Sequence, residues 1–293
     1  MLVFGTACAH GVKKNHETAS IEISDQDLHT LNIDVDGLSG LTLASPDLAW
    51  AVAEIQRKIV KLAVSDKEIK PITTINIIGV ADGLDTESVV ALTPNTFILG
   101  TEQSGEHTSD ALLFAQLANN ELRVTSKVDV PYSLWDITMD DNHGIEGLCT
   151  AGNHLFAAIE YAKEESTADT RIAPLLMAGI DGSNMRPLWL SLTTKRGTLS
   201  DIACTIDAQG NPVVYAIERH FGVGRILRFT VPPEATQKTI VPDIIFDLSR
   251  GFSSSPNFEG IMIRDRSLFL LSDNHFVTWQ GPTMWFRFPL LEQ

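Results

Sequence analysis

Four acidic residues recur along the chain at positions that could hold a cation. They are Glu87, Glu146, Asp201 and Glu259, and successive members lie 59, 55 and 58 residues apart. Carboxylates that converge on one point repel one another and raise one another's pKa unless they share a cation. Ca²⁺ is bound by several oxygen atoms from carboxylates, amides and carbonyl groups. The spacing therefore predicts that these four residues are ligands of a divalent metal, with Ca²⁺ as the first choice.

Residues beside these acids could carry out proton transfer or hold an anion. Histidine is the side chain most often used for proton transfer, and His143, His220 and His275 are the candidates. Arg219 directly follows Glu218, and its guanidinium could grip a carboxylate or phosphate of a substrate. It could equally pair with a carboxylate of a neighbouring sheet. We take His143, Glu218, Arg219 and His275 as the candidate catalytic residues.

A third set of residues is expected to line the channel and contact substrate. Asn257 and Asn274 would add amide oxygens, Asp273 closes a strand, and Arg196 could reach the rim from its loop. A solvated loop is the alternative for Arg196. No serine-esterase elbow, P-loop, HExxH or GxGxxG motif occurs, so neither a nucleotide nor an organic cofactor is expected.

An architectural role for the acids is the competing interpretation. An acid repeated at a strand entrance can accept hydrogen bonds from backbone N–H groups of a neighbouring sheet. The same role is open to the acids that close the second strand of each repeat, which are Glu54, Glu102, Glu160, Glu218 and Asp273. A position repeated in every sheet is more readily explained by architecture than by an asymmetric active site.

The elements that must position these residues are five similar hairpins. Each consists of a short apolar strand, a turn rich in Gly, Pro, Asn or Asp, and a second apolar strand. The segments are 37–54, 85–102, 145–160, 200–218 and 258–273. Residues 49–64 could be read as a helix, but their alignment with the other copies favours two strands.

This repeat predicts an all-β fold, a β-propeller, because sheets arranged around an axis bury one another's faces. Five marked copies predict five blades. A sixth, unmarked blade within 70–85 or 230–250 is the alternative. The strand-like segment 20–36 is expected to pair with the carboxyl-terminal strand near 284–291 and so close the last blade.

Composition excludes several classes of protein. The chain has 293 residues, 22 Lys and Arg, 37 Asp and Glu, a net charge of −15 and 44% hydrophobic residues. This hydrophobic fraction is enough for a core and argues against a disordered chain. Such an acidic body disfavours nucleic-acid binding, which needs a basic surface. No apolar run is long enough for a membrane-spanning helix.

The amino terminus and the cysteines bear on location. The apolar start that ends at Cys8 is similar to the tail of a bacterial lipoprotein signal, although it lacks a basic start and is short. Residues 1–19 would then be a signal remnant or flexible tether, with a lipid anchor at Cys8, and 20–293 a single domain. A frayed terminus of a cytoplasmic protein is the alternative. Cys149 and Cys204 are expected to be buried thiols, with a disulfide between them as the alternative.

Several ordered segments resemble the phytase-like family known for the "esterase-like activity of phytase". They include Asn257-Phe-Glu-Gly-Ile261, His143-Gly-Ile-Glu-Gly-Leu148 and Leu199-Ser-Asp-Ile202, and the match runs over nearly the whole chain. The chain departs from the family pattern at Ser88, where Gly is usual, at His143, where Arg is usual, and at His275, where Asn is usual. Loss of that Arg weakens the argument that a phosphate is held at the rim.

The resemblance implies an exported bacterial β-propeller that hydrolyses an ester or phosphoester, with its site in the central channel. A bound divalent cation would polarise the substrate and activate a water. The alternative function is a non-catalytic propeller that binds a small ligand, an envelope glycan or a partner protein. The expected location is the cell envelope, periplasmic and lipid-anchored or secreted.

Overall fold

A computed structural model describes residues 23–54, 56–139, 142–164, 171–220, 222–231, 239–252, 256–274 and 281–290. These residues contain strands and three short 3₁₀ turns, namely η1 (Asp25–Asp27), η2 (Tyr132–Leu134) and η3 (Leu248–Arg250), and no α-helix. The predicted all-β fold is confirmed. Among the described residues no helix is long and apolar enough to cross a membrane.

Most of the strands form five antiparallel groups of four, each of which begins at the centre and ends at the outside. The first group is β2 (Leu38–Ser45), β3 (Leu48–Ala53), β4 (Lys58–Val64) and β5 (Ile69–Ile78). The second is β6 (Leu84–Thr93), β7 (Thr96–Gln103), β8 (Ser109–Ala118) and β9 (Glu121–Pro131). The third is β10 (His143–Ala151), β11 (His154–Ile159), β13 (Arg171–Gly179) and β14 (Arg186–Ser191).

The last two groups contain the later strands of the chain, and the fifth also contains β1. The fourth is β15 (Thr198–Ile206), β16 (Pro212–His220), β17 (Val223–Thr230) and β19 (Asp243–Asp247). The fifth is β20 (Phe258–Arg264), β21 (Ser267–Ser272), β22 (Met284–Pro289) and β1 (His29–Thr30). Two further short strands, β12 (Lys163–Glu164) and β18 (Thr239–Ile240), add to the edges of the third group.

Turn residues explain why these segments form hairpins. Asn119 and Asn120 both have positive φ between β8 and β9, and Asp265 and Arg266 do so between β20 and β21. Two consecutive residues with positive φ form the turn that matches the twist of paired strands. A helix over residues 49–64 was the alternative to two strands. The prediction of two strands is confirmed, because β3 and β4 lie there and pair with each other.

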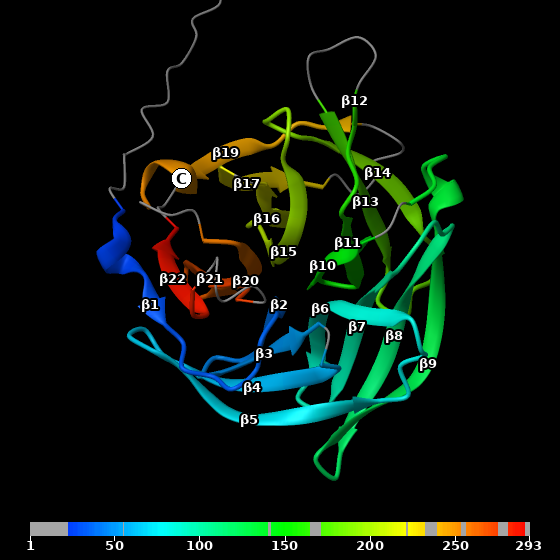
Figure 1. The fold of residues 1–293 in the computed structure, drawn as a ribbon. Coiled ribbons are helices and arrows are strands. Elements are labelled where there is room, and N and C mark those ends of the chain that lie inside the picture. Colours follow the sequence, from blue (N-terminus) through cyan, green and yellow to red (C-terminus); the bar gives the residue numbers. More distant parts are fainter. Residues whose placement is uncertain are drawn as a thin grey trace, which may run out of the picture.

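The first strands of the five groups surround a common centre (Figure 1). Each contacts the next in the cyclic order β2, β6, β10, β15, β20 and back to β2. The first and last described strands, β1 and β22, meet in the fifth group, where His29 pairs with Trp285 and Thr30 with Met284. A sheet edge that would otherwise be free is thereby partly covered.

The hydrophobic core is divided into five clusters, one between each pair of neighbouring groups. Trp50, for example, lies with Phe97 between the first and second groups, and both are almost fully buried. Burying one such aromatic side chain stabilises a fold by about 2–3 kcal/mol. Each sheet therefore depends on its two neighbours.

Cys149 of β10 and Cys204 of β15 form a disulfide, with their Cα atoms 5.4 Å apart. The expectation of two free buried thiols is therefore wrong, and the alternative that spacing could not decide is the one observed. Cys8, the expected lipid attachment site, and His275, a candidate catalytic residue, lie outside the described residues.

Candidate functional site

Three of the predicted metal ligands occupy the same local structure. Glu87, Glu146 and Glu259 are each the extra residue of a β-bulge near the start of a first strand. A bulged residue has no partner opposite it, so its side chain is turned away from the regular pleat. All three are at most 6% exposed. The bulge thus directs a charged side chain to the interior of the ring.

Asp201 does not share this geometry. In β15 the extra residue is Ser200, and Asp201 pairs normally with Ile217. The carboxylate of Asp201 accepts backbone N–H groups from Ile202 at 2.8 Å and from Ile261 at 2.7 Å. It also accepts the N–H of Leu41 at 3.2 Å. Burial raises the pKa of Asp201, while these N–H groups lower it. Its position favours the architectural interpretation over metal binding.

Glu54, Glu259 and Asp273 bring three carboxylates together where the first and fifth groups meet. One oxygen from each lies within 4.8 Å of the other two. Glu54 follows β3, Asp273 follows β21, and Glu259 lies in β20. The three residues therefore converge because the ring brings the end of the chain beside its beginning.

Glu259 is at the centre of this arrangement. Its Oε1 atom lies 2.5 Å from Nη2 of Arg219 and accepts a hydrogen bond of 2.6 Å from Nδ2 of Asn257. Burial raises the pKa of Glu259 to about 7, against the lowering effect of the Arg219 charge. The neighbouring charges of Asp273 and Glu160 also raise it. Arg219 thus takes the second of its two expected roles and pairs with a carboxylate of the next group.

Burial also disfavours the charged form of the other carboxyl groups near the centre. Burial raises the pKa of Glu54, Glu87 and Glu146, and each is raised further by neighbouring acids. Glu146 Oε1 is buried and has no hydrogen-bond partner among the residues that the structure describes. An unpaired buried carboxylate oxygen is costly. This part of the structure would be stabilised by a bound cation or by protons.

Glu218 has a separate and well-defined role. Its two carboxylate oxygens accept the backbone N–H groups of Thr193 and Thr194 at 2.9–3.2 Å and the hydroxyl groups of both threonines. Arg225 in turn donates to the carbonyl and hydroxyl oxygens of Thr193. Glu218 is fully buried, and it holds the loop between β14 and β15. These contacts indicate a structural role for this predicted catalytic residue.

The remaining predicted residues are dispersed. Asn274 is buried, and its amide bridges the N–H of Gly37 and the carboxylate of Asp36, so it joins the fifth group to the first. Arg196 is exposed on its loop, which agrees with the alternative prediction of a solvated loop. His143 is half-buried at the start of β10, and His220 is exposed at the end of β16.

Two members of the carboxylate cluster were absent from the predicted metal ligands: Asp273 was expected to contact substrate, and Glu54 was given no site role. The sequence marked it only as an acid that closes a second strand, and that position was interpreted as architectural. Glu160, another such acid, accepts a 2.8 Å hydrogen bond from the hydroxyl of Thr198. The signal that could have singled out Glu54 is its place in the first repeat, since the first and last repeats are in contact.

A second buried polar cluster supports the segment that leads into β10. Asp110 accepts hydrogen bonds from the hydroxyl of Tyr132 and from Gln103, and it lies 3.0 Å from Nε2 of His107. Burial raises the pKa of Asp110, whereas these partners lower it. The cluster ties the β7–β8 loop to residues 132–139 and so fixes the approach to β10.

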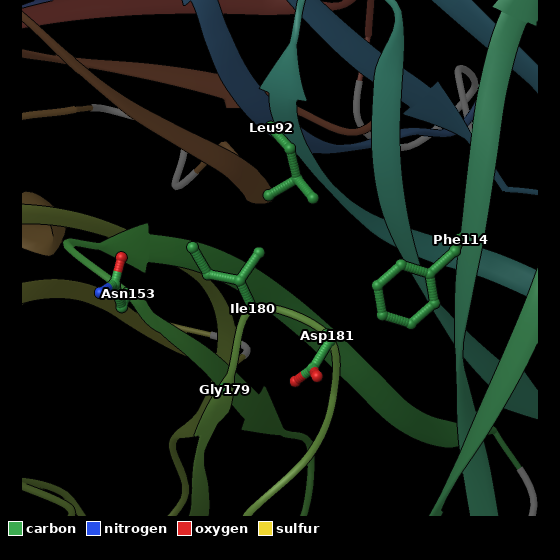
Figure 2. A pocket seen from close by; sticks show the side chains of 6 residues that line it. All are labelled: Leu92, Phe114, Asn153, Gly179, Ile180 and Asp181. Atoms are coloured by element: carbon green, nitrogen blue, oxygen red, sulfur yellow. The ribbon is translucent and has the colours of Figure 1, made fainter.

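A surface pocket of about 460 Å³ lies away from these acids (Figure 2). Leu92, Phe114 and Ile180 give it an apolar wall, and Asn153 and Asp181 lie at its side. Its residues come from the second and third groups, at the ends of strands opposite the bulged glutamates. It has no carboxylate cluster, and we assign the candidate site to the centre of the ring instead.

Several solved structures are similar to this chain at low sequence identity. A luciferin-regenerating enzyme is 13% identical, with 92% of this chain and 95% of that chain covered and a TM-score of 0.45. An aldose sugar dehydrogenase from Streptomyces coelicolor in its PQQ-bound form is 10% identical, with coverages of 89% and 97% and a TM-score of 0.49. A putative 6-phosphogluconolactonase from Bacteroides uniformis is 11% identical, with coverages of 84% and 81% and a TM-score of 0.42.

A comparison with curated proteins gave no match. The family model described as "Phytase-like: Esterase-like activity of phytase" matches residues 33–276. This match spans most of the chain and includes the bulged glutamates and the cluster formed by Glu54, Glu259 and Asp273. The chain therefore belongs to the phytase-like family.

Proposed function

We propose that the chain is a five-bladed β-propeller closed by β1 and β22. Five groups of four strands, five core clusters and the cyclic contacts of the first strands support five blades. The pairing of His29 with Trp285 supports closure. The described parts of 70–85 and 230–250 belong to the first, second, third and fourth groups or their connections, and these parts leave no strands for a sixth blade.

The site at the centre of the ring is proposed to bind a divalent cation. The observation that carries this proposal is the convergence of oxygens from Glu54, Glu259 and Asp273 within 4.8 Å of one another. The unpartnered and buried Glu146 Oε1 is an independent sign that a positive group is needed here. An all-oxygen donor set rich in carboxylates suits Ca²⁺ better than a softer metal.

The proposed reaction is hydrolysis of a small ester or phosphoester, which membership of the phytase-like family supports. A bound divalent cation supplies polarisation of the substrate and a lowered pKa for a water molecule. Arg219 favours the ionised form of Glu259 and partly offsets the acidic field that an anionic substrate would meet. His143, half-buried at the start of β10, is the proposed proton carrier.

A non-catalytic propeller that binds a small ligand, envelope glycan or partner protein is the second candidate. Asp201, Glu218 and Asn274 favour it, because all three are engaged with backbone or loop groups. The acids that remain would then form a ligand site without reaction chemistry.

An exported protein is proposed for the location. The Cys149–Cys204 disulfide supports an oxidising compartment, since disulfides are rare in the cytosol. Attachment of a lipid at Cys8 and a domain that spans 20–293 remain parts of this proposal. The net charge of −15 supports partners other than nucleic acid.

The test uses the full chain, freed of metal by EGTA and then supplied with Ca²⁺, Mg²⁺ or Mn²⁺. Bound metal is measured by mass spectrometry, and panels of aryl esters, lactones and phosphomonoesters are assayed in each state. Turnover that appears with Ca²⁺ and disappears in the Glu259→Gln variant supports the hydrolase. Stoichiometric Ca²⁺ binding without turnover supports the binding protein, and absence of both rejects the cation site.

A further inference from the structure

We propose that Asp201 is a positioning residue for the cation site, because its carboxylate holds in register the first strands that carry Glu146 and Glu259. This inference rests on the proposed cation site and deepens it. Asp201 itself would not touch the cation. It would act through the backbone of the strands around it.

The carboxylate of Asp201 accepts hydrogen bonds from the first strands of several groups. Its Oδ2 atom accepts the N–H of Ile261 in β20 at 2.7 Å and that of Leu41 in β2 at 3.2 Å. Its Oδ1 atom accepts the N–H of Ile202 at 2.8 Å, and the N–H of Leu148 in β10 is a further donor. One side chain therefore connects the first strands of the first, third, fourth and fifth groups.

Two of the N–H donors to Asp201 lie close in sequence to the bulged glutamates. Ile261 lies two residues after Glu259, and Leu148 lies two residues after Glu146. Both glutamates are the extra residues of bulges, where regular strand pairing does not fix the backbone. A hydrogen bond two residues away from each bulge limits how far the strand can slide. Asp201 thus supplies the restraint that the local pairing lacks.

The packing around Asp201 leaves no room for it to turn toward the acids. It is 1% exposed, and a Cβ added to Gly147 would lie 2.8 Å from its Cα atom and 2.7 Å from the nitrogen of Ile202. Strands β10 and β15 are therefore in backbone contact at this level. The Cys149–Cys204 disulfide joins the same two strands three residues farther on.

A carboxylate is needed because several N–H donors converge on two oxygen atoms. The amide of Asn offers one acceptor oxygen and would direct its own N–H₂ group at backbone donors. The Asp201→Asn variant keeps size and shape while it removes part of the restraint. Asp207 provides a matched control, since its carboxylate accepts the N–H groups of Gln209 and Asn211 in the outer turn of the same hairpin.

The experiment measures Ca²⁺ affinity by calorimetry on the full chain of the wild type, Asp201→Asn and Asp207→Asn. Loss of a group that orients metal ligands costs about 10–100-fold in affinity. We expect the dissociation constant of Asp201→Asn to rise at least about tenfold and that of Asp207→Asn to change less than about twofold. Eu³⁺ bound in place of Ca²⁺ should show more water ligands, by its luminescence lifetime, in Asp201→Asn alone.

Two outcomes separate this inference from the proposed function. If the wild type binds no Ca²⁺, the cation site itself is rejected. If the wild type binds and a folded Asp201→Asn binds with the same affinity and lifetime, the positioning role is overturned. If Asp201→Asn does not fold, hydrogen exchange of the backbone amides of the wild type tests the positioning role instead. Leu41, Leu148 and Ile261 should stay equally protected with Ca²⁺ and with EGTA, and loss of protection in EGTA would refute the role.

Discussion

Nη2 of Arg219 lies 2.5 Å from Oε1 of Glu259 and joins the fourth group of strands to the fifth. Arg219 directly follows Glu218, yet the two side chains have different tasks, because neighbours in a strand point to opposite faces. Glu218 holds a loop, whereas Arg219 enters the carboxylate cluster. Its positive charge favours the ionised form of the buried Glu259 and so partly offsets the rise in pKa that burial causes.

Replacement of Arg219 by Met should lower the stability of the metal-free protein and tighten cation binding. Glu259 would lose its ion pair, and removal of one partner from a buried pair costs about 3–5 kcal/mol because it leaves the other charge uncompensated. The cluster would also become more negative, so the Ca²⁺ affinity should rise several-fold. Urea unfolding in EGTA and calorimetry with Ca²⁺ measure the two effects. Arg123→Met, which breaks an exposed pair with Glu121, is the control and should change neither.

The stability of the metal-free protein should fall as the pH rises. Glu259 has a folded-state pKa of about 7, above its ordinary value of 4.5. A group with a raised pKa contributes stability below the unfolded value, and this is lost as pH rises through the folded value. Urea unfolding in EGTA should therefore show a loss of up to about 3 kcal/mol between pH 5 and pH 8.

Two controls accompany this pH profile. Saturating Ca²⁺ should flatten it, because the cation replaces the protons. Asp66, Asp181 and Asp207 have lowered pKa values and affect stability only at more acidic pH. The prediction would be contradicted if the metal-free protein were as stable at pH 8 as at pH 5, or more stable, because ionisation of the buried acids would then cost no stability.

Replacement of Glu218 by Gln should reduce stability and leave the cation site intact. The amide keeps one acceptor for the threonine donors and loses the other, at a cost of about 1–3 kcal/mol. Thermal melting reports the loss, and the Ca²⁺ dissociation constant should stay within about twofold of the wild type. A folded variant with normal stability and no turnover would instead support the catalytic role that the sequence had suggested.

Removal of the disulfide by the double substitution Cys149→Ala and Cys204→Ala should lower the free energy of unfolding by about 2–4 kcal/mol. The bond closes a segment in which the two cysteines are 55 residues apart, and it joins two neighbouring groups. The urea midpoint measures the effect. Two free thiols in the purified, unreduced protein would contradict the bond.

Local signals in the sequence were enough to predict the hairpins. Alternating apolar residues and turn residues such as Asn119-Asn120 depend on near neighbours, so the strands of residues 49–64 were correctly preferred to a helix. The cyclic order of the repeats also indicated that distant acids would come together.

The roles of single acids could not be predicted in the same way. Asp201 was grouped with Glu146 because each acid opens the first strand of its repeat, but the bulge in β15 falls one residue earlier, at Ser200. A shift of one residue reverses the face to which a side chain points. Glu54 became part of the cluster only through the contact between the first and last groups, which no local pattern encodes.

The most direct test of a cation site at the centre of the ring is anomalous diffraction from crystals of the full chain soaked with Eu³⁺ in place of Ca²⁺. The account predicts one strong peak with carboxylate oxygens of Glu54, Glu259 and Asp273 at roughly 2.3–2.6 Å, the usual distance for such ligands. A peak confined to the outer surface, or none at the centre with all three carboxylates still clustered, would contradict it.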